Sequence, residues 1–83
     1  MTLEILTPEG KIFSGDVYGV QLPGISGLFE VLENHAPLVS ALKAGKLKIL
    51  KDKNSSSFYT IQSGFVQVIT NTTTVLVEGA SEV

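Results

Sequence analysis

The sequence of 83 residues predicts an all-β fold, a sandwich or barrel of short strands without a long helix. Two observations predict this class. Runs of alternating apolar and polar residues recur about every 8–12 residues, with turn residues between them, as in sandwiches and barrels. The composition, 43% apolar and 17% charged, is that of a globular domain. Because no linker or repeat interrupts the pattern, we predict one domain over residues 1–83.

The alternation predicts strands over residues 2–7, 11–13, 17–22, 28–32, 46–52, 58–62, 65–70 and 74–78. Residues 7–10, Thr-Pro-Glu-Gly, predict the first turn, because proline presets the second turn position and glycine suits the fourth. Residues 14–16, Ser-Gly-Asp, predict a bulge or a bend. Pro23-Gly24 is expected to end the third strand. The run 38–42 fits either a strand or a single helical turn.

The stretch 23–42 combines turn residues with large apolar side chains more densely than any other part of the chain. Asn34 is predicted at a corner because asparagine tolerates a left-handed backbone, and the residues before Pro37 should be extended. The large apolar residues of this stretch are Leu28, Phe29, Val31, Leu32, Leu38, Val39 and Leu42. Some must form the core, and we expect others at the surface, where apolar patches mark interaction sites.

The composition argues against several kinds of site. A net charge of −2 without any arginine disfavours a nucleic-acid or anionic-lipid surface. The absence of cysteine rules out disulfides and thiolate ligands, and one histidine is too few for a typical metal centre. No run approaches the ~20 apolar residues that cross a bilayer, and an acidic start with Glu4 does not resemble a signal peptide. We expect no metal, cofactor or small-molecule ligand.

His35 is the one candidate for catalysis. A hydrolase could combine it with a serine and with Asp16 or Asp52, but no Gly-x-Ser-x-Gly motif is present. Because an active site needs several converging groups, we predict that His35 hydrogen-bonds a loop backbone and offers its ring to a partner. We therefore predict that the chain is not an enzyme.

Five of the six basic residues fall between positions 43 and 53. One interpretation is a small β-barrel that binds single-stranded nucleic acid through Lys46, Lys48 and Lys51, with Phe58 and Tyr59 as stacking groups. The other is that the lysines line an exposed strand and protect its edge from pairing with another chain. The negative net charge favours the second interpretation.

The segment from Pro23 to Leu38 resembles the epsilon subunit of the rotary ATP synthase, with a glycine-containing loop, a short strand and then His-Ala-Pro-Leu. The resemblance continues through Gly-Lys-Leu-Lys-Ile at 45–49, Ser-Gly-Phe-Val-Gln-Val at 63–68 and Thr-Val-Leu-Val at 74–77, and it reaches back to Phe-Ser-Gly at 13–15. It covers essentially the whole chain in order. It implies a flattened β-sandwich of roughly ten strands and a non-catalytic part of the central stalk.

In that family the sandwich docks on the gamma subunit and touches the membrane c-ring, which couples proton-driven rotation to ATP synthesis. The resemblance implies a gamma-subunit interface of Thr7, His35, Ala36, Pro37, Leu38 and Ser40. It implies a c-ring interface of Ser26, Gly27, Leu28 and Phe29. It also implies a peripheral location on the cytoplasmic face of the bacterial inner (plasma) membrane, as part of the complex.

The sequence departs from the family pattern at several positions. Leu28 stands where the family usually has an acid, Glu30 stands where a glycine is common, and Glu33-Asn34 replaces Pro-Gly before the histidine. Many members carry a C-terminal helical hairpin that inhibits hydrolysis or senses ATP. This sequence reaches Val83 without a helical segment of that composition, so we expect the chain to lack that domain.

Overall fold

The structure, a computed structural model that describes residues 1–83, contains ten β-strands and no helix. The strands are β1 (Thr2–Thr7), β2 (Gly10–Asp16), β3 (Gly19–Gly24), β4 (Gly27–Leu32), β5 (Leu38–Leu42), β6 (Gly45–Leu50), β7 (Ser56–Ile61), β8 (Gly64–Ile69), β9 (Thr72–Val77) and β10 (Ala80–Glu82). The all-β prediction is confirmed. The structure offers no helical segment with the length and hydropathy that a membrane span requires.

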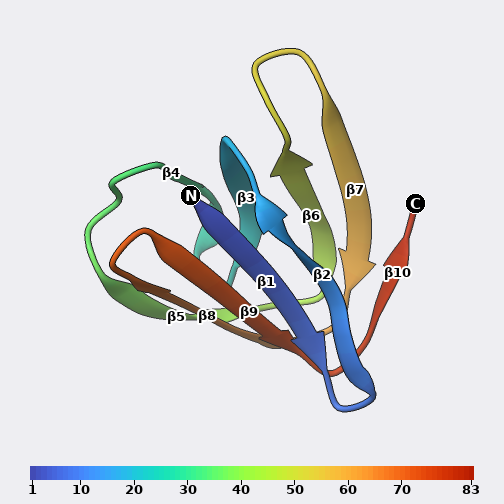
Figure 1. The fold of residues 1–83 in the computed structure, drawn as a ribbon. Coiled ribbons are helices and arrows are strands. Elements are labelled where there is room, and N and C mark those ends of the chain that lie inside the picture. Colours follow the sequence, from blue (N-terminus) through green and yellow to red (C-terminus); the bar gives the residue numbers. More distant parts are fainter.

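The strands form one continuous sheet in the order β10-β7-β6-β3-β5-β8-β9-β1-β2, with β4 paired to β3. The sheet folds over where β3 meets β5, because these two strands share a single pair, Gly24 and Leu42. One layer therefore holds β4, β3, β6, β7 and β10, and the other holds β5, β8, β9, β1 and β2 (Figure 1). Neighbouring strands are antiparallel except for β1 and β9, which run side by side in parallel.

Sixteen buried apolar side chains fill the space between the two layers. They come from alternate positions of most strands, because successive side chains of a strand point to opposite faces. Leu47 and Ile49 of β6, in one layer, and Val66 and Val68 of β8, in the other, all belong to this interior, and none of the four is more than 1% exposed. Burying each such side chain is worth about 1.5–3 kcal/mol. The predicted inward positions of β6 are confirmed.

Two local predictions were wrong. Pro23-Gly24 does not end β3, which continues through both residues. Proline is tolerated at this point because β3 pairs with β6 only as far as Gln21, so no ladder hydrogen bond on that side is lost. The bulge predicted at 14–16 lies at Ile12 instead, since the register passes from Ile5–Phe13 to Leu6–Lys11.

Three further comparisons concern an ambiguous run, a turn and a strand that the sequence did not predict. The run 38–42, which fitted two structures, is a strand. The turn between β8 and β9 consists of Thr70 and Asn71, two residues with positive φ, and Thr72 already pairs with Ile69. The strand β10 was not predicted from the sequence, and it pairs with β7 along the edge of the first layer.

The position of β6 corrects the interpretation of the lysines. This strand lies between β3 and β7 and is hydrogen-bonded to both. A strand with two neighbours has no free edge to protect, so edge protection does not explain Lys46 and Lys48.

Candidate interaction surfaces

The outward side of the second layer carries a row of apolar side chains across four strands. The register pairs Ala41 of β5 with Phe65 of β8, Phe65 with Leu76 of β9, and Leu76 with Leu6 of β1. Paired residues share a face, so all four side chains point away from the core. Phe65 is 58% exposed and Leu76 is 47% exposed. An apolar row of this kind is a candidate docking surface.

A cleft of about 540 Å³ borders this apolar row. Its lining includes Leu6, Thr7, Ile25, Phe65, Leu76 and Glu78. Thr7 is the last residue of β1, and its hydroxyl donates to the carbonyl of Gly10 and accepts from the N–H of Glu9, both at 3.2 Å. These hydrogen bonds hold the turn in place, so Thr7 forms a fixed part of the cleft rim.

A second row on the same face is mostly polar. Val39 of β5, which is 73% exposed, is followed across the layer by Gln67, Thr74 and Glu4. Glu4 forms an ion pair with Lys11 of β2 at 3.2 Å. The outward face of β5, β8, β9 and β1 thus combines an apolar row with a polar one, the mixture found in docking interfaces.

His35 lies in the loop between β4 and β5, where its backbone N–H donates to the carbonyl of Leu32 at 3.2 Å. Its Nδ1 lies 2.7 Å from the carbonyl oxygen of Ala36. Asn34 has a φ of 66°, the left-handed corner that the sequence predicted. The predicted hydrogen bond to loop backbone is confirmed. The only hydrogen bond of the ring is to this carbonyl, and none joins it to a serine or an aspartate.

The six predicted gamma-interface residues do not form one cluster. Leu38 and Ser40 pair with Val68 and Val66, so their side chains point inward, and Leu38 packs against the core. The loop of His35, Ala36 and Pro37 adjoins the end of β5 that pairs with Val68. Thr7 follows the Leu6–Leu76 pair at the opposite end of the layer. The predicted residues therefore fall into two groups. Those of the loop and Thr7 lie at the two ends of the outward face, and Leu38 and Ser40 lie on the inner side of β5.

The four predicted c-ring residues lie together in the hairpin between β3 and β4. Gly27 has a φ of 132°, a backbone conformation that favours glycine. Leu28 points outward and is 68% exposed, whereas Phe29 packs inward on the core. Its ring also covers Gly24, where an added Cβ would lie 2.8 Å from the ring. Ser26, Gly27, Leu28 and Phe29 line a cleft of about 290 Å³ together with Ser40.

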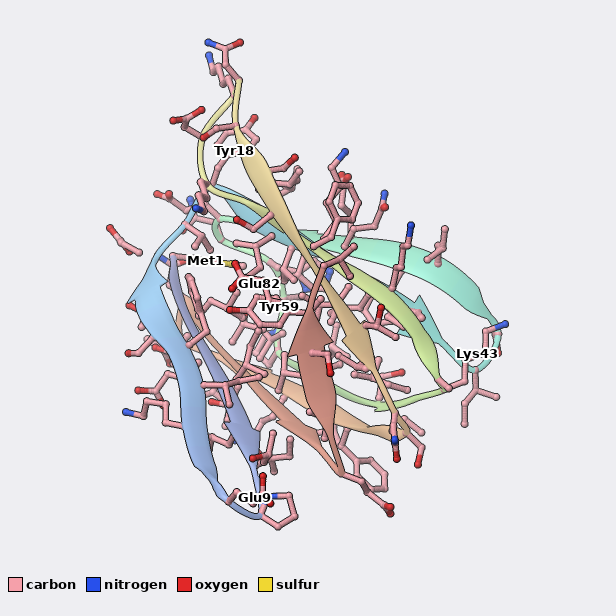
Figure 2. The ribbon with its side chains drawn as sticks, turned by 90° about the vertical axis from the view of Figure 1, so that its right-hand side faces the viewer. Met1, Glu9, Tyr18, Lys43, Tyr59 and Glu82 are labelled. Atoms are coloured by element: carbon pink, nitrogen blue, oxygen red, sulfur yellow. The ribbon has the colours of Figure 1, made fainter.

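Two titratable groups have shifted pKa values, and neither belongs to a catalytic cluster. The N–H of Asn54 lowers the pKa of the Asp52 carboxyl in an exposed loop. Burial raises the pKa of the Tyr59 phenol, and the negative charge of Glu82 adds to this effect. Figure 2 shows Tyr59 and Glu82 close together where β10 pairs with β7. The structure contains no group of three or more His, Cys, Asp or Glu residues that could hold a metal ion.

Sequence reasoning did not identify the outward apolar row. A signal was present, because Ile5-Leu6, Phe65-Val66 and Val75-Leu76-Val77 place apolar residues on both faces of their strands. A strand with two apolar faces in so small a domain has to expose one of them. The pairing of the strands was also needed, since it aligns these residues into one row.

The fold is a small β-sandwich, and its candidate sites are docking surfaces. Comparison with known proteins gives its family. Residues 1–83 match the family described as ATP synthase, Delta/Epsilon chain, beta-sandwich domain. The chain therefore belongs to this family, as the sequence motifs indicated. It is a non-catalytic subunit of ATP synthase and part of a membrane-bound complex.

Relatives of known family support this assignment. The ATP synthase epsilon chain of Chlorobaculum tepidum is 42% identical over 80 residues, which cover 96% of this chain and 91% of that protein. The epsilon chain of Chlorobium limicola is 45% identical, with 95% and 90% coverage. The epsilon chain of a Sulfurovum species is 49% identical, but the chain spans only 62% of that protein.

In solved structures, the fold is similar to a chain of the Euglena gracilis mitochondrial ATP synthase, OSCP/F1/c-ring, with a TM-score of 0.90. That match is 22% identical and covers 96% of this chain and 51% of that chain. A chain of the Tetrahymena thermophila mitochondrial ATP synthase central stalk/c-ring has a TM-score of 0.84 at 21% identity, with 98% and 65% coverage. At these identities the similarity concerns the fold. None of these comparisons supports the nucleic-acid alternative.

Proposed function

We propose that the chain connects the gamma subunit of ATP synthase to the c-ring and thereby couples proton-driven rotation to ATP synthesis. The observation that carries this proposal is the exposed apolar row of Ala41, Phe65, Leu76 and Leu6 on a rigid two-layered sandwich. A rotating stalk needs a part that transmits torque without deforming. A closely packed β-sandwich suits this role because its interior has low compressibility.

The gamma subunit is expected to lie on the outward face of β5, β8, β9 and β1. The loop of His35, Ala36 and Pro37 borders this face at one end, and Thr7 borders it at the other. Leu38 and Ser40 hold the strand β5 in place from the inner side. Phe65 is the expected centre of the contact, because exposed aromatic side chains are frequent anchors of interfaces.

The c-ring is expected to meet the hairpin of Ser26, Gly27, Leu28 and Phe29. Leu28, which is 68% exposed, is the most exposed large apolar side chain at this turn, ahead of Ile25 at 64%. Phe29 fixes the hairpin to the core. The contact with the ring is thus apolar at position 28. As part of the complex the chain would lie on the cytoplasmic face of the bacterial inner membrane, and the bacterial origin of its relatives supports this location.

Charge substitution on the outward face tests the gamma contact. Phe65→Glu and His35→Glu should each weaken binding to a cognate gamma subunit by about tenfold or more, as expected for the loss of an interface anchor. Leu28→Glu adds the same charge at a more exposed position outside this face and should leave gamma binding unchanged. Binding is measured by calorimetry, with circular dichroism to show that each variant is folded. Normal binding by Phe65→Glu would contradict the gamma assignment.

Crosslinking tests the c-ring contact. Because the chain contains no cysteine, Leu28→Cys introduces a unique attachment point for a photoactivatable maleimide. In the assembled complex we expect this probe to form a product with the c subunit. The same probe at Asn54→Cys, in the exposed loop between β6 and β7 at the other end of the layer, is the control and should not. Equal products from both positions would show that position 28 does not face the ring.

A further inference from the structure

Lys46 and Lys48 form a feature that neither the fold nor the proposed interfaces explain. They lie two residues apart on β6 and point outward, because Leu47 and Ile49 on either side of Lys48 are fully buried. Both ammonium groups lie over the ring of Phe58 on β7, with their nitrogens 5.7 Å and 5.6 Å from the ring centroid. Phe58 pairs directly with Lys48 in the sheet.

Neither ammonium group has a carboxylate partner. The ion pairs of the structure involve Lys11 and the N-terminal ammonium, and no hydrogen bond is made by the side chain of Lys46 or Lys48. The neighbours across the strands are neutral, Thr60 beside Lys46 and Gln21 beside Lys48. Two like charges are thus held near one ring without an ion-pair partner, and the acid in the same row of the sheet, Glu30, lies one strand beyond Gln21. An anion placed between them would relieve their repulsion.

The charge of the chain is unevenly distributed around this feature. Residues 43–53 contain five lysines and one aspartate, a net charge of +4, whereas the other residues contain one lysine and seven acids, a net charge of −6. Lys43 begins this segment at one edge of the molecule, well away from the β1–β2 turn that carries Glu9 (Figure 2). The positive charge is therefore concentrated along β6 and its flanking loops, on the layer opposite the apolar row.

We propose that Lys46, Lys48 and Phe58 form a second docking surface, which binds a carboxylate-rich segment of another subunit of the same complex. Charge complementarity selects this occupant. Residues two apart on a strand are about 7 Å apart, so the surface fits two carboxylates at that spacing with an apolar side chain over the Phe58 ring. The proposal rests on the proposed function, because the partner is sought within the assembled ATP synthase.

Zero-length coupling tests this surface in the purified complex. A carbodiimide activates a carboxylate as an O-acylisourea, and a lysine amine in contact with that carbon attacks it to form an amide bond while the substituted urea leaves. We expect mass spectrometry to find isopeptide bonds from Lys46 or Lys48 to an aspartate or glutamate of a neighbouring subunit. These products should disappear in the double variant K46Q/K48Q. They should persist in K51Q/K53Q, which removes the same charge from the adjacent loop.

Acetylation rates give a second measurement. In the complex Lys46 and Lys48 should react with an acetylating reagent at least about tenfold more slowly than in the isolated chain, as buried interface groups do. Lys51 and Lys53 should react at similar rates in both. Unprotected Lys46 and Lys48, or coupling only through the loop lysines, would overturn the inference while the chain still enters the complex. A chain that does not enter the complex would overturn the proposed function as well.

Discussion

The side-chain oxygen of Asn71 accepts a hydrogen bond from the backbone N–H of Asn34 at 3.1 Å. The two residues lie in different turns, and both have left-handed backbones, with φ of 59° and 66°. The main-chain carbonyl of Asn71 also accepts from the N–H of Thr2. The turn between β8 and β9 thus holds both the loop that carries His35 and the beginning of β1. One side chain joins the candidate gamma surface to the scaffold.

Asn71→Ala should lower the free energy of unfolding by about 1–2 kcal/mol, because the Asn34 N–H loses its acceptor and alanine is less tolerant of a left-handed backbone. Urea denaturation measures this change. Hydrogen exchange at Asn34 and His35 should also become faster. Asn71→Asp keeps an acceptor at the same place, so its free energy of unfolding should fall by less. Unchanged exchange in the loop of Asn71→Ala would show that the hydrogen bond does not hold it.

Thr70→Asn should stabilise the protein. Thr70 has a φ of 45°, an unfavourable conformation for a β-branched residue. With Asn71 it forms a two-residue hairpin turn in which both residues have positive φ, and asparagine is preferred at the first of these positions. We expect a gain of about 1 kcal/mol, measured as a higher thermal midpoint. A lower midpoint would mean that Thr70 makes a favourable contact that outweighs its backbone conformation.

Gly64→Ala should destabilise the protein by about 2–3 kcal/mol, as overpacking does. An added Cβ at this position would meet the carbonyl oxygen of Leu76 and lie 2.8 Å from the Cα of Val77. Relief would require β8 and β9 to separate. Gly79→Ala is the control, because its nearest neighbour would be the flexible Gln62 side chain at 3.6 Å. Equal midpoints for the two variants in urea would contradict this account of Gly64.

Stability should fall at alkaline pH because of Tyr59. Burial raises the pKa of its phenol, and Glu82 raises it further. The unfolded chain ionises at the ordinary pKa of about 10. The stabilisation from keeping the phenol neutral is complete below that pH and is lost as the pH rises through the higher folded-state pKa. Tyr59→Phe should flatten this decline in urea denaturation curves, and Tyr18→Phe, at an exposed position, serves as the control.

Local patterns in the sequence were sufficient for the strands and several corners. Alternation identified the inward residues Leu47 and Ile49, and the tolerance of asparagine for positive φ identified the corner at Asn34. The same rules were wrong at Pro23-Gly24, because whether a strand tolerates proline depends on its neighbours. That information lies in the pairing of β3 with β6, which the local sequence does not contain.

Among the candidate surfaces, too, some could be predicted from local sequence and others required the strand pairing. The hairpin of Ser26 to Phe29 is contiguous in sequence, so motif comparison could place its residues together. The row of Ala41, Phe65, Leu76 and Leu6 comes from four strands, and only their register aligns it. The interpretation of the β6 lysines also depended on the strand order. Strands inside a sheet and strands at its edge have the same alternation, so the sequence could not show that β6 has a neighbour on each side.

The parallel pairing of β1 with β9 constrains when the protein can fold during translation. Leu3 pairs with Thr73, so the first strand emerges from the ribosome long before its neighbour is synthesised. Until then β1 has only β2 beside it, and an isolated two-stranded hairpin is marginally stable at best. Such distant pairings slow folding to milliseconds or longer, and they leave apolar strands open to aggregation in the nascent chain. Chaperone dependence during synthesis would follow from this arrangement.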